Sequence, residues 1–270
     1  MKHFTLAATL LGAIAIAPMA NAQSFSQLIE DIEVTSTIDT VSEYVFRGIS
    51  LGENSVQPGT QLSVYGFTAG TWYSTGFGKS SAAQLDELDL YAGYQLPLDG
   101  PVQLGIGGTA YVYPQGNDID DSSGGTTATY EVNATAGLQD VLFSPSVFAA
   151  YDFTLDNFTI EGNLSHSFDL PRDGWSLEAS LNGGHVELDE VVTGATPDED
   201  FDSYQYGTIS LAANKVITDN IGFYVSGNFT ANTEDDTLNF DIIDNTPDTP
   251  DSFNDSSTVF WVGSGLSVGF

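Results

Sequence analysis

The carboxy-terminal stretch from Ser257 to Phe270 alternates between two kinds of position. One set of alternate positions holds mainly bulky apolar side chains, and the other holds mainly glycine and serine, with Val259 and Trp261 near its start. A period of two indicates a β-strand whose two faces meet different surroundings. Because the strand ends on its apolar face with an aromatic residue, it is typical of a strand with lipid outside and water inside. The alternative is an ordinary edge strand of a soluble sandwich. The rest of the chain must decide between a lipid-facing strand and a soluble one.

The amino-terminal segment predicts an export signal. Met1-Lys2-His3 precedes an apolar stretch, and Ala20-Asn21-Ala22 fits the rule for cleavage after small residues. We therefore expect a signal peptide over residues 1–22 and a single mature domain over residues 23–270. After Ala22 no apolar run approaches the roughly 18 residues of a membrane-spanning helix. A membrane-spanning fold would then have to be a closed β-barrel, since only helices and barrels satisfy the backbone in lipid.

The charge balance is strongly acidic. The 270 residues include 5 Lys and Arg against 37 Asp and Glu, and removing the leader takes the net charge from −32 to −33. Binding of nucleic acid or anionic lipid needs a basic surface, so both are excluded as functions. The acidity fits a saline habitat, divalent cations at loops or a cation-favouring pore, although simple solvation accounts for most such charges. The absence of cysteine fits an exported protein that does not depend on disulfides.

From Glu33 onward, alternating segments are separated by turn signals. Tyr44 and Phe46 share the expected lipid-facing parity of the first segment, whereas Glu43 and Arg47 share its inward parity. Twelve strands are expected, with ten or fourteen as alternatives. Their expected ranges are Glu33–Arg47, Ser55–Tyr65, Thr68–Gly76, Gln84–Leu96, Val102–Tyr113, Thr126–Gln139, Pro145–Leu155, Phe158–Asp169, Trp175–His185, Ser203–Val216, Ile221–Thr230 and Ser257–Phe270.

The connections between these segments are sorted by length. Short turns follow the even strands, and longer acidic connections follow all the odd strands except the seventh, whose turn at Leu155-Asp156-Asn157 is short. The longer connections are Ile49–Asn54, Phe77–Ala83, Pro114–Gly125, Val186–Asp202 and Ala231–Ser256. This asymmetry is typical of a barrel with both termini in the periplasm, and a soluble sandwich has no cause to show it. The sequence therefore predicts an all-β, transmembrane antiparallel barrel of the outer membrane, with short periplasmic turns and long extracellular loops.

Five blocks of the chain together resemble a known family. In order, they are Tyr44-Val45-Phe46-Arg47-Gly48-Ile49-Ser50, Gly70-Thr71-Trp72, Glu87-Leu88-Asp89-Leu90-Tyr91-Ala92-Gly93-Tyr94, Tyr111-Val112-Tyr113-Pro114 and Tyr130-Glu131. They resemble the TorF-type porins, also called the Gcw_chp family of bacterial outer-membrane proteins, over most of the mature chain. The resemblance implies an outer-membrane barrel with a channel role, and it implies no established substrate.

One cation is expected inside the barrel. Of the mature Lys and Arg residues, only Arg47 lies on the inward parity of a strand. We expect its guanidinium to pair with one or more of Glu87, Asp89 and Glu131, which lie on the inward parity near the same level. A guanidinium suits bidentate carboxylate contacts. Such a pair could form a constriction that sets selectivity, or it could be a structural brace, and both interpretations stay open. The candidate lumen residues are Arg47, Glu43, Glu87, Asp89, Glu131, Tyr91 and Tyr111.

Further inward carboxylates lack matching cations, so the lumen is expected to be negative and to concentrate cations. The alternative is that they only hydrate a polar interior. These residues are Asp39, Asp152, Glu161 and Glu178.

Catalysis and cofactor binding are not expected. The mature chain has only His166 and His185, and neither is placed for a Ser–His catalytic pair. No nucleotide-binding loop or Cys/His metal cluster is present. Acidic residues of the loops are weak candidates for Ca²⁺, with solvated charge as the alternative. These candidates are Asp118, Asp120 and Asp121.

The sequence thus predicts a porin-like channel for passive diffusion of small hydrophilic solutes or ions, with cation preference. The rival is a non-conducting structural or adhesion barrel whose acidic loops bind cations. The expected partners are outer-membrane lipid, lipopolysaccharide, the solute and the barrel assembly machinery, and the solute and oligomeric state stay open. The assembly machinery would read the carboxy-terminal alternation at Phe260, Val262, Leu266, Val268 and Phe270.

Overall fold

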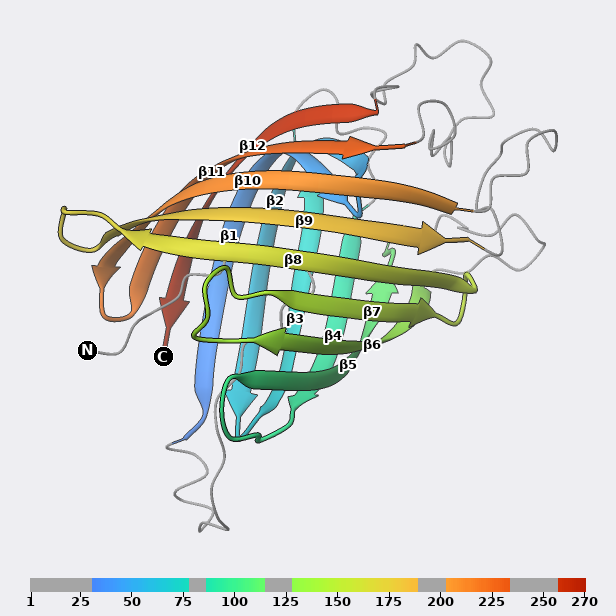
Figure 1. The fold of residues 1–270 in the computed structure, drawn as a ribbon. Helices are drawn as coiled ribbons and strands as arrows, with labels where there is room; N and C mark the ends of the chain where they lie inside the picture. Colours follow the sequence, from blue (N-terminus) through green and yellow to red (C-terminus); the bar gives the residue numbers. More distant parts are fainter. Residues whose placement is uncertain (1–30, 78–85, 115–127, 189–202, 234–256) are drawn as a thin grey trace.

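The computed structural model describes residues 31–77, 86–114, 128–188, 203–233 and 257–270. These ranges form twelve strands, each antiparallel to its neighbours, and the sheet closes on itself as a barrel (Figure 1). The predicted strand number and fold class are confirmed. The strands are β1 (Glu33–Phe46), β2 (Ile49–Val64), β3 (Phe67–Gly76), β4 (Glu87–Gln95), β5 (Val102–Val112), β6 (Ala128–Leu138), β7 (Ser146–Asp152), β8 (Asn157–Asp169), β9 (Trp175–Glu187), β10 (Ser203–Thr218), β11 (Ile221–Asn232) and β12 (Thr258–Gly269).

No helix in the described part of the chain is long and apolar enough to cross a membrane.

The barrel closes through the pairing of β1 with β12. Their register runs from Thr35 opposite Gly269 to Val41 opposite Gly263. The first and last strands therefore meet, as a closed barrel requires, and the ladder satisfies their backbone groups along this stretch. Because Thr35 lies near the start of β1 and Gly269 near the end of β12, both ends of the barrel chain lie on one side.

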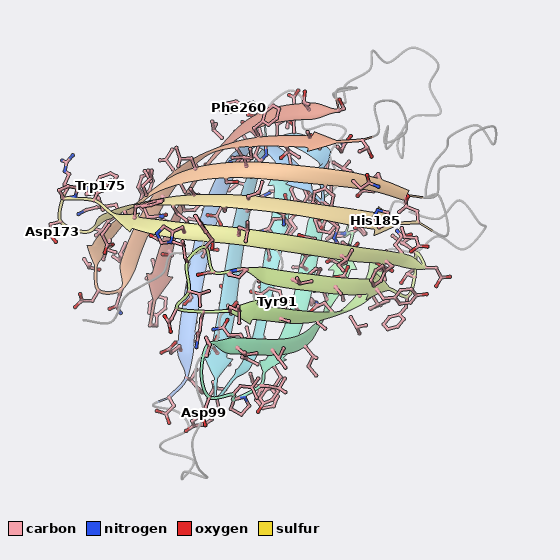
Figure 2. All side chains as sticks on the ribbon, viewed as in Figure 1. Tyr91, Asp99, Asp173, Trp175, His185 and Phe260 are labelled. Carbon is pink, nitrogen blue, oxygen red and sulfur yellow. The ribbon has the colours of Figure 1, made fainter. Side chains whose placement is uncertain are left out.

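The two faces of the wall differ as the alternation predicts. In β8, Ile160 and Leu164 are exposed on the outer surface, whereas Thr159 and Glu161 are buried on the opposite face. In β12, Phe260 is 68% exposed and stands on the outside (Figure 2). An apolar outer band around a polar interior is the pattern of a transmembrane barrel, because the outer face meets lipid.

Short turns lie at the end of the barrel that carries the chain termini. The turn between β2 and β3 is only Tyr65 and Gly66, with φ values of 49° and 81°. At the turn between β8 and β9, Lys215 Nζ donates to the carbonyl oxygen of Asp173 at 2.6 Å. Arg172 lies 5.6 Å from the ring centre of Trp175, which Figure 2 shows at this end. These two cations therefore belong to the periplasmic rim and not to the lumen.

The prediction of a loop over Ile49–Asn54 is wrong. This stretch is the first part of β2, and the connection to β1 is a tight turn of Arg47 and Gly48. The other four longer connections lie largely outside the described residues. β1 pairs with β12 only as far as Val41, and β2 pairs with β3 only from Ser55. Between these points the two strands pair only with each other, so they form a hairpin that leaves the wall.

We call residues Glu43–Glu53 the inner hairpin. In Figure 1 the outer ends of β1 and β2, drawn in blue, bend away from the wall. The bend coincides with a β-bulge between Tyr44 and Val45 and with a φ of 45° at Asn54. Bulges twist and redirect a strand pair, so these irregularities explain locally why the hairpin turns inward.

The predicted lipid-facing position of Tyr44 and Phe46 is also wrong. Tyr44 is 5% exposed and packs in a cluster with Val41 and Trp72, and Phe46 packs against the same cluster inside the barrel. The prediction assumed that β1 stays in the wall along its whole length. Because the inner hairpin has left the wall, both of its faces lie within the barrel and alternation no longer separates lipid from lumen.

Candidate functional site

The tip of the inner hairpin has a backbone that few residues can adopt. Arg47 and Gly48 have φ values of 48° and 86°. Positive φ at both central residues is the geometry of the tight hairpin turns that match strand twist. Gly48 is also sterically required, because a Cβ at this position would lie 2.3 Å from Cβ of Tyr206. The glycine thus lets the tip contact β10 on another part of the wall.

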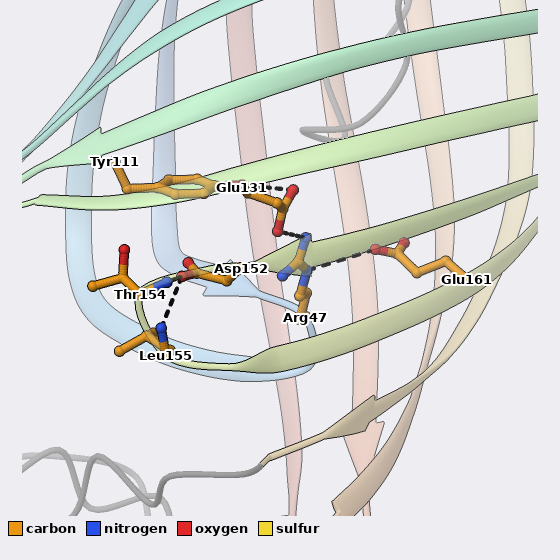
Figure 3. Close-up of polar contacts among 7 residues, drawn as sticks. All are labelled: Arg47, Tyr111, Glu131, Asp152, Thr154, Leu155 and Glu161. Atoms are coloured by element: carbon orange, nitrogen blue, oxygen red, sulfur yellow. Dashed lines mark hydrogen bonds and ion pairs between the residues drawn. The ribbon is translucent and has the colours of Figure 1, made fainter.

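Arg47 joins the tip to two further strands (Figure 3). Its Nη2 donates to Oε2 of Glu131 on β6 at 2.7 Å, and its Nε lies 3.9 Å from Oε1 of Glu161 on β8. The first contact is a charge-assisted hydrogen bond, whereas the second is an ion pair too long for one. The guanidinium also lies 4.7 Å from the ring centre of Phe46 and 5.9 Å from that of Phe148. Arg47 is therefore held by two carboxylates and two aromatic rings.

The tip and the stem have other anchors. Nδ2 of Asn232 on β11 donates to the carbonyl oxygen of Gly48 at 2.8 Å. The hydroxyl of Tyr44 donates to Oε1 of Glu87 on β4 at 3.0 Å. Ile49 packs against a buried cluster on β9 and β10 that consists of Val186, Tyr204 and Tyr206. The inner hairpin is thus attached to strands on several sides of the barrel.

The three carboxylates that were expected near Arg47 have different surroundings. Glu131 pairs with Arg47 and also accepts a hydrogen bond from the Tyr111 hydroxyl at 3.3 Å. Glu87 instead accepts from Tyr44. Asp89 is fully buried on β4, where its carboxyl group interacts with that of Glu87. The structure therefore brings Arg47 together with one of the three.

The remaining predicted lumen residues lie close to the inner hairpin. Glu43 is part of it and accepts from the Ser50 hydroxyl at 2.8 Å. Tyr91 packs against the cluster around Tyr44, and its hydroxyl lies 3.4 Å from Oε1 of Gln61. Sequence reasoning identified Glu161 as an inward residue but did not pair it with Arg47, because strand parity does not show how far a hairpin reaches into the lumen.

Phe148, Tyr206 and Asn232 were missed altogether as contacts of the tip. A usable signal existed for two of them. Phe148 and Tyr206 are aromatic residues at inward positions of β7 and β10, where polar residues are expected. Large apolar side chains on a water-facing surface indicate that another part of the chain packs there. Asn232 carried no such signal, since an inward amide is ordinary in a polar lumen.

A cavity lies beside the inner hairpin. Its volume is about 390 Å³, and it is lined by Glu43 and Arg47 of the hairpin. It also reaches Gln95, Gln103 and Glu178, which lie near the periplasmic ends of β4, β5 and β9. The cavity thus extends from the inner hairpin toward the periplasmic end of the barrel, and the hairpin narrows the lumen at its own level.

Carboxylates greatly outnumber cations on the inner surface that the structure describes. Asp89 is fully buried, and most of the others are nearly so. Arg47 is the cation among them, since Arg172 and Lys215 belong to the periplasmic rim. The inward carboxylates are Asp39, Glu43, Glu87, Asp89, Glu131, Asp152, Glu161 and Glu178.

The other predicted sites lie elsewhere. Asp118, Asp120 and Asp121 fall outside the described residues, as does the expected signal peptide. Among described residues, no group of three or more His, Asp or Glu is placed to hold a metal ion. The ring of His166 packs against Phe143 and Phe168 near the periplasmic end, with centroid distances of 5.8 and 4.6 Å. His185 lies near the outer end of β9, with Nδ1 3.5 Å from Nε2 of Gln205 (Figure 2).

The fold places the chain in a class of proteins. A closed antiparallel barrel with an apolar outer band and a polar lumen is the architecture of transmembrane barrels of the bacterial outer membrane. The NanC porin shares it, with a TM-score of 0.52 and 9% sequence identity over 88% of this chain and 98% of that one.

Two further solved structures are similar at lower scores. The KdgM porin in complex with disordered oligogalacturonate has a TM-score of 0.49 and 9% identity over 88% of this chain and 99% of that one. The COG4313 outer membrane channel from Pseudomonas putida F1 has a TM-score of 0.46 and 14% identity over 88% and 94% of the two chains. At these identities the likeness concerns the fold alone. No curated protein is similar enough in sequence to count as a match.

The chain belongs to the Gcw_chp family, described as "Bacterial protein of unknown function (Gcw_chp)", whose family model matches residues 29–262. The predicted family is therefore confirmed, although the match does not carry the name TorF. Some of the sequence blocks that carried the resemblance are in contact in the folded barrel. Tyr44 and Arg47 on the inner hairpin contact Glu87 of the β4 block and Glu131 of the β6 block.

Proposed function

We propose that this barrel is an outer-membrane channel for passive diffusion of small hydrophilic solutes or ions, with a preference for cations. The observation that supports this proposal is the charge of the lumen, where buried and half-buried carboxylates face a single described guanidinium. Carboxylates in a confined, low-dielectric space raise the local concentration of cations and repel anions. Diffusion makes and breaks no covalent bond, so pore width and lumen charge would set selectivity.

The inner hairpin is the proposed constriction. It crosses from β1 and β2 to contacts on β6, β8, β10 and β11, and it therefore occupies part of the cross-section. A narrow point is where fixed charges act most strongly on a passing ion, because the ion loses water there. Arg47 would weaken cation preference at this point, and the surrounding carboxylates would strengthen it.

Planar-bilayer recording of refolded protein tests the proposal. We expect well-resolved conductance, with a reversal potential in a KCl gradient that indicates cation selectivity. Anion selectivity would refute the assigned preference. Silence of correctly folded protein would instead favour the rival class, a non-conducting barrel that binds cations or partners through its acidic loops.

Arg47 has two possible roles that the same recordings separate. Its two carboxylates and two aromatic contacts support a brace, and its position at the constriction supports a selectivity element. If Arg47→Ala leaves the cation preference unchanged and lowers the unfolding temperature, Arg47 is a brace. If the reversal potential shifts toward stronger cation preference, Arg47 takes part in selectivity.

Export and assembly complete the proposal. Residues 1–22 would direct the chain across the inner membrane and would then be removed. The barrel assembly machinery would recognise the alternating carboxy-terminal residues, whose apolar side chains lie on the outer face of β12. The mature barrel would then lie in contact with lipid and lipopolysaccharide.

A further inference from the structure

The cavity beside the inner hairpin has walls rich in hydrogen-bond acceptors. Asp39 is 5% exposed and accepts hydrogen bonds from Tyr224 and Thr37. Glu178 accepts a hydrogen bond from Asn214. These two lining carboxylates are bonded to neutral donors, so their negative charge is not offset by a neighbouring cation. Burying a charge, as for Asp39, or half-burying it, as for Glu178, is costly unless a cation compensates it.

A buried amide adds a further acceptor to this wall. Gln95 lines the cavity at the periplasmic end of β4 and is only 3% exposed. Its Oε1 has no hydrogen-bond partner among the described residues. An unpaired buried carbonyl oxygen favours a ligand that brings its own donor. The carboxylates and the amide together therefore favour a positively charged molecule with several hydrogen-bond donors.

Aromatic side chains form another part of the same wall. Trp72, Trp261 and Phe148 all line the cavity, and the rings of Tyr44 and Trp72 lie 5.4 Å apart at 52°. Aromatic faces attract organic cations through their quadrupole, most strongly where water is excluded. Carboxylates beside aromatic rings therefore suit an alkylammonium group. The carboxylates and the ring faces both attract its charge, and the rings also pack against its methylene chain.

We propose that this cavity binds organic ammonium ions of the size of a linear polyamine. The inference rests on the proposed channel, since it names the solute class that would pass or block it. The volume of about 390 Å³ falls within the range of small-molecule sites, roughly 300–1,000 Å³. Neutral polyols would leave the carboxylate charges uncompensated, and anions would be repelled. Inorganic cations would gain less from the aromatic wall.

Binding is tested by calorimetric titration of spermidine into the folded, detergent-solubilised protein at about 0.3 M KCl, where surface charges are largely screened. The variant pair Asp39→Asn and Glu178→Gln removes two cavity charges while keeping side-chain size and acceptor oxygens. We expect the affinity for spermidine to fall at least tenfold in this double variant. The matched control is Asp99→Asn with Asp173→Asn, which removes the same charge from exposed periplasmic turns and is expected to bind like the parent.

The outcomes separate this inference from the channel itself. Absence of spermidine binding, or equal binding by the cavity variant and the parent, overturns the ammonium site. Equal binding of 1,4-butanediol also overturns it, because that molecule is a linear chain with polar ends and no charge. If the double variant does not fold, Glu178→Gln alone gives the same test. If the protein conducts ions but does not bind spermidine, the channel proposal holds and the ammonium site is refuted. If it binds spermidine but does not conduct, the site holds and the channel proposal is refuted.

Discussion

Gly48 and Tyr206 lie so close together that a Cβ on Gly48 would stand 2.3 Å from Cβ of Tyr206. Gly48 belongs to the hairpin of β1 and β2, and Tyr206 belongs to β10 of the wall. This contact, the hydrogen bond from Asn232 and the ion pair of Arg47 place the tip on strands that are remote in sequence. The inner hairpin therefore crosses part of the lumen, and its two ends continue into the wall.

Gly48→Ala is expected to loosen the inner hairpin. The added methyl would meet Tyr206, and alanine disfavours a φ of 86°. Strain and overpacking of this kind cost about 1–3 kcal/mol. We expect lower thermal stability in a heat-modifiability gel assay and greater current noise in bilayers.

The matched control is Gly100→Ala in the turn between β4 and β5. Gly100 has a similar φ of 94°, but a Cβ added to it would have no atom within 4 Å. This variant carries the backbone strain without the collision. Equal effects of the two substitutions on current noise would show that the Tyr206 contact is unimportant.

Glu131→Gln is expected to destabilise the protein more than Glu161→Gln. Glu131 makes the 2.7 Å contact with Arg47 and its side chain is only 2% exposed, whereas Glu161 lies at 3.9 Å. Removing one partner of a buried ion pair leaves the other charge uncompensated and costs about 3–5 kcal/mol. We expect a loss of stability near the lower end of this range for Glu131→Gln and a smaller loss for Glu161→Gln, measured by urea unfolding in detergent.

A double-mutant cycle provides the control for this ion pair. Arg47→Ala combined with Glu131→Gln removes both charges, so its loss of stability should be smaller than the sum of the two single losses. Additive losses would mean that the two side chains do not interact in the folded protein.

Replacing the inner hairpin by an Asn-Gly turn between Ser42 and Asn54 is expected to widen the pore without opening the wall. The ladders of β1 with β12 and of β2 with β3 do not include the removed residues. The backbone N–H of Val262 still donates to the Ser42 hydroxyl, and that of Phe77 to the Asn54 carbonyl. Asn-Gly suits the tight turn.

We expect several-fold higher single-channel conductance and faster liposome swelling with small sugars for this shortened protein. Unchanged conductance in protein that still shows heat modifiability would place the narrowest point somewhere other than the inner hairpin.

Phe270→Ala is expected to reduce the amount of barrel in the outer membrane with little effect on spontaneous refolding in detergent. Phe270 is 77% exposed, so its side chain contributes little to the folded barrel. Quantitative immunoblotting of membrane fractions measures the first effect, and refolding yield measures the second. Leu142→Ala, at an exposed residue of the β6–β7 turn, serves as the apolar control. An equal loss in refolding yield would indicate a structural role for Phe270 instead of recognition.

Most of the wall could be predicted from the sequence because a lipid-facing barrel imposes one simple rule. Each residue either meets lipid or does not, so alternation along β8 and β12 gave both the strands and their faces. The pairing of β1 with β12 followed from the need to leave no edge in lipid. These constraints act on each strand separately and can be read one segment at a time.

The site was less accessible because it depends on contacts between remote segments. Alternation is also compatible with a free hairpin, so Tyr44 and Phe46 could not be assigned to the lumen from their spacing. The turn was hidden as well, since Arg47 is not a typical residue for positive φ. Glu131 was found because it shares the inward parity and the outer level of Arg47, whereas Glu161 required knowledge of how far the tip reaches.

The inner hairpin gives this barrel a bore that can be adjusted independently of its circumference. In a simple barrel, the diameter of the wall is set by the number, tilt and stagger of the strands together, so a change of diameter alters every strand. Here the residues that narrow the lumen form one continuous segment with no ladder to β3 or β12. Inserting or deleting a residue pair between Glu43 and Glu53 would lengthen or shorten the obstruction while the surrounding strands stay in register.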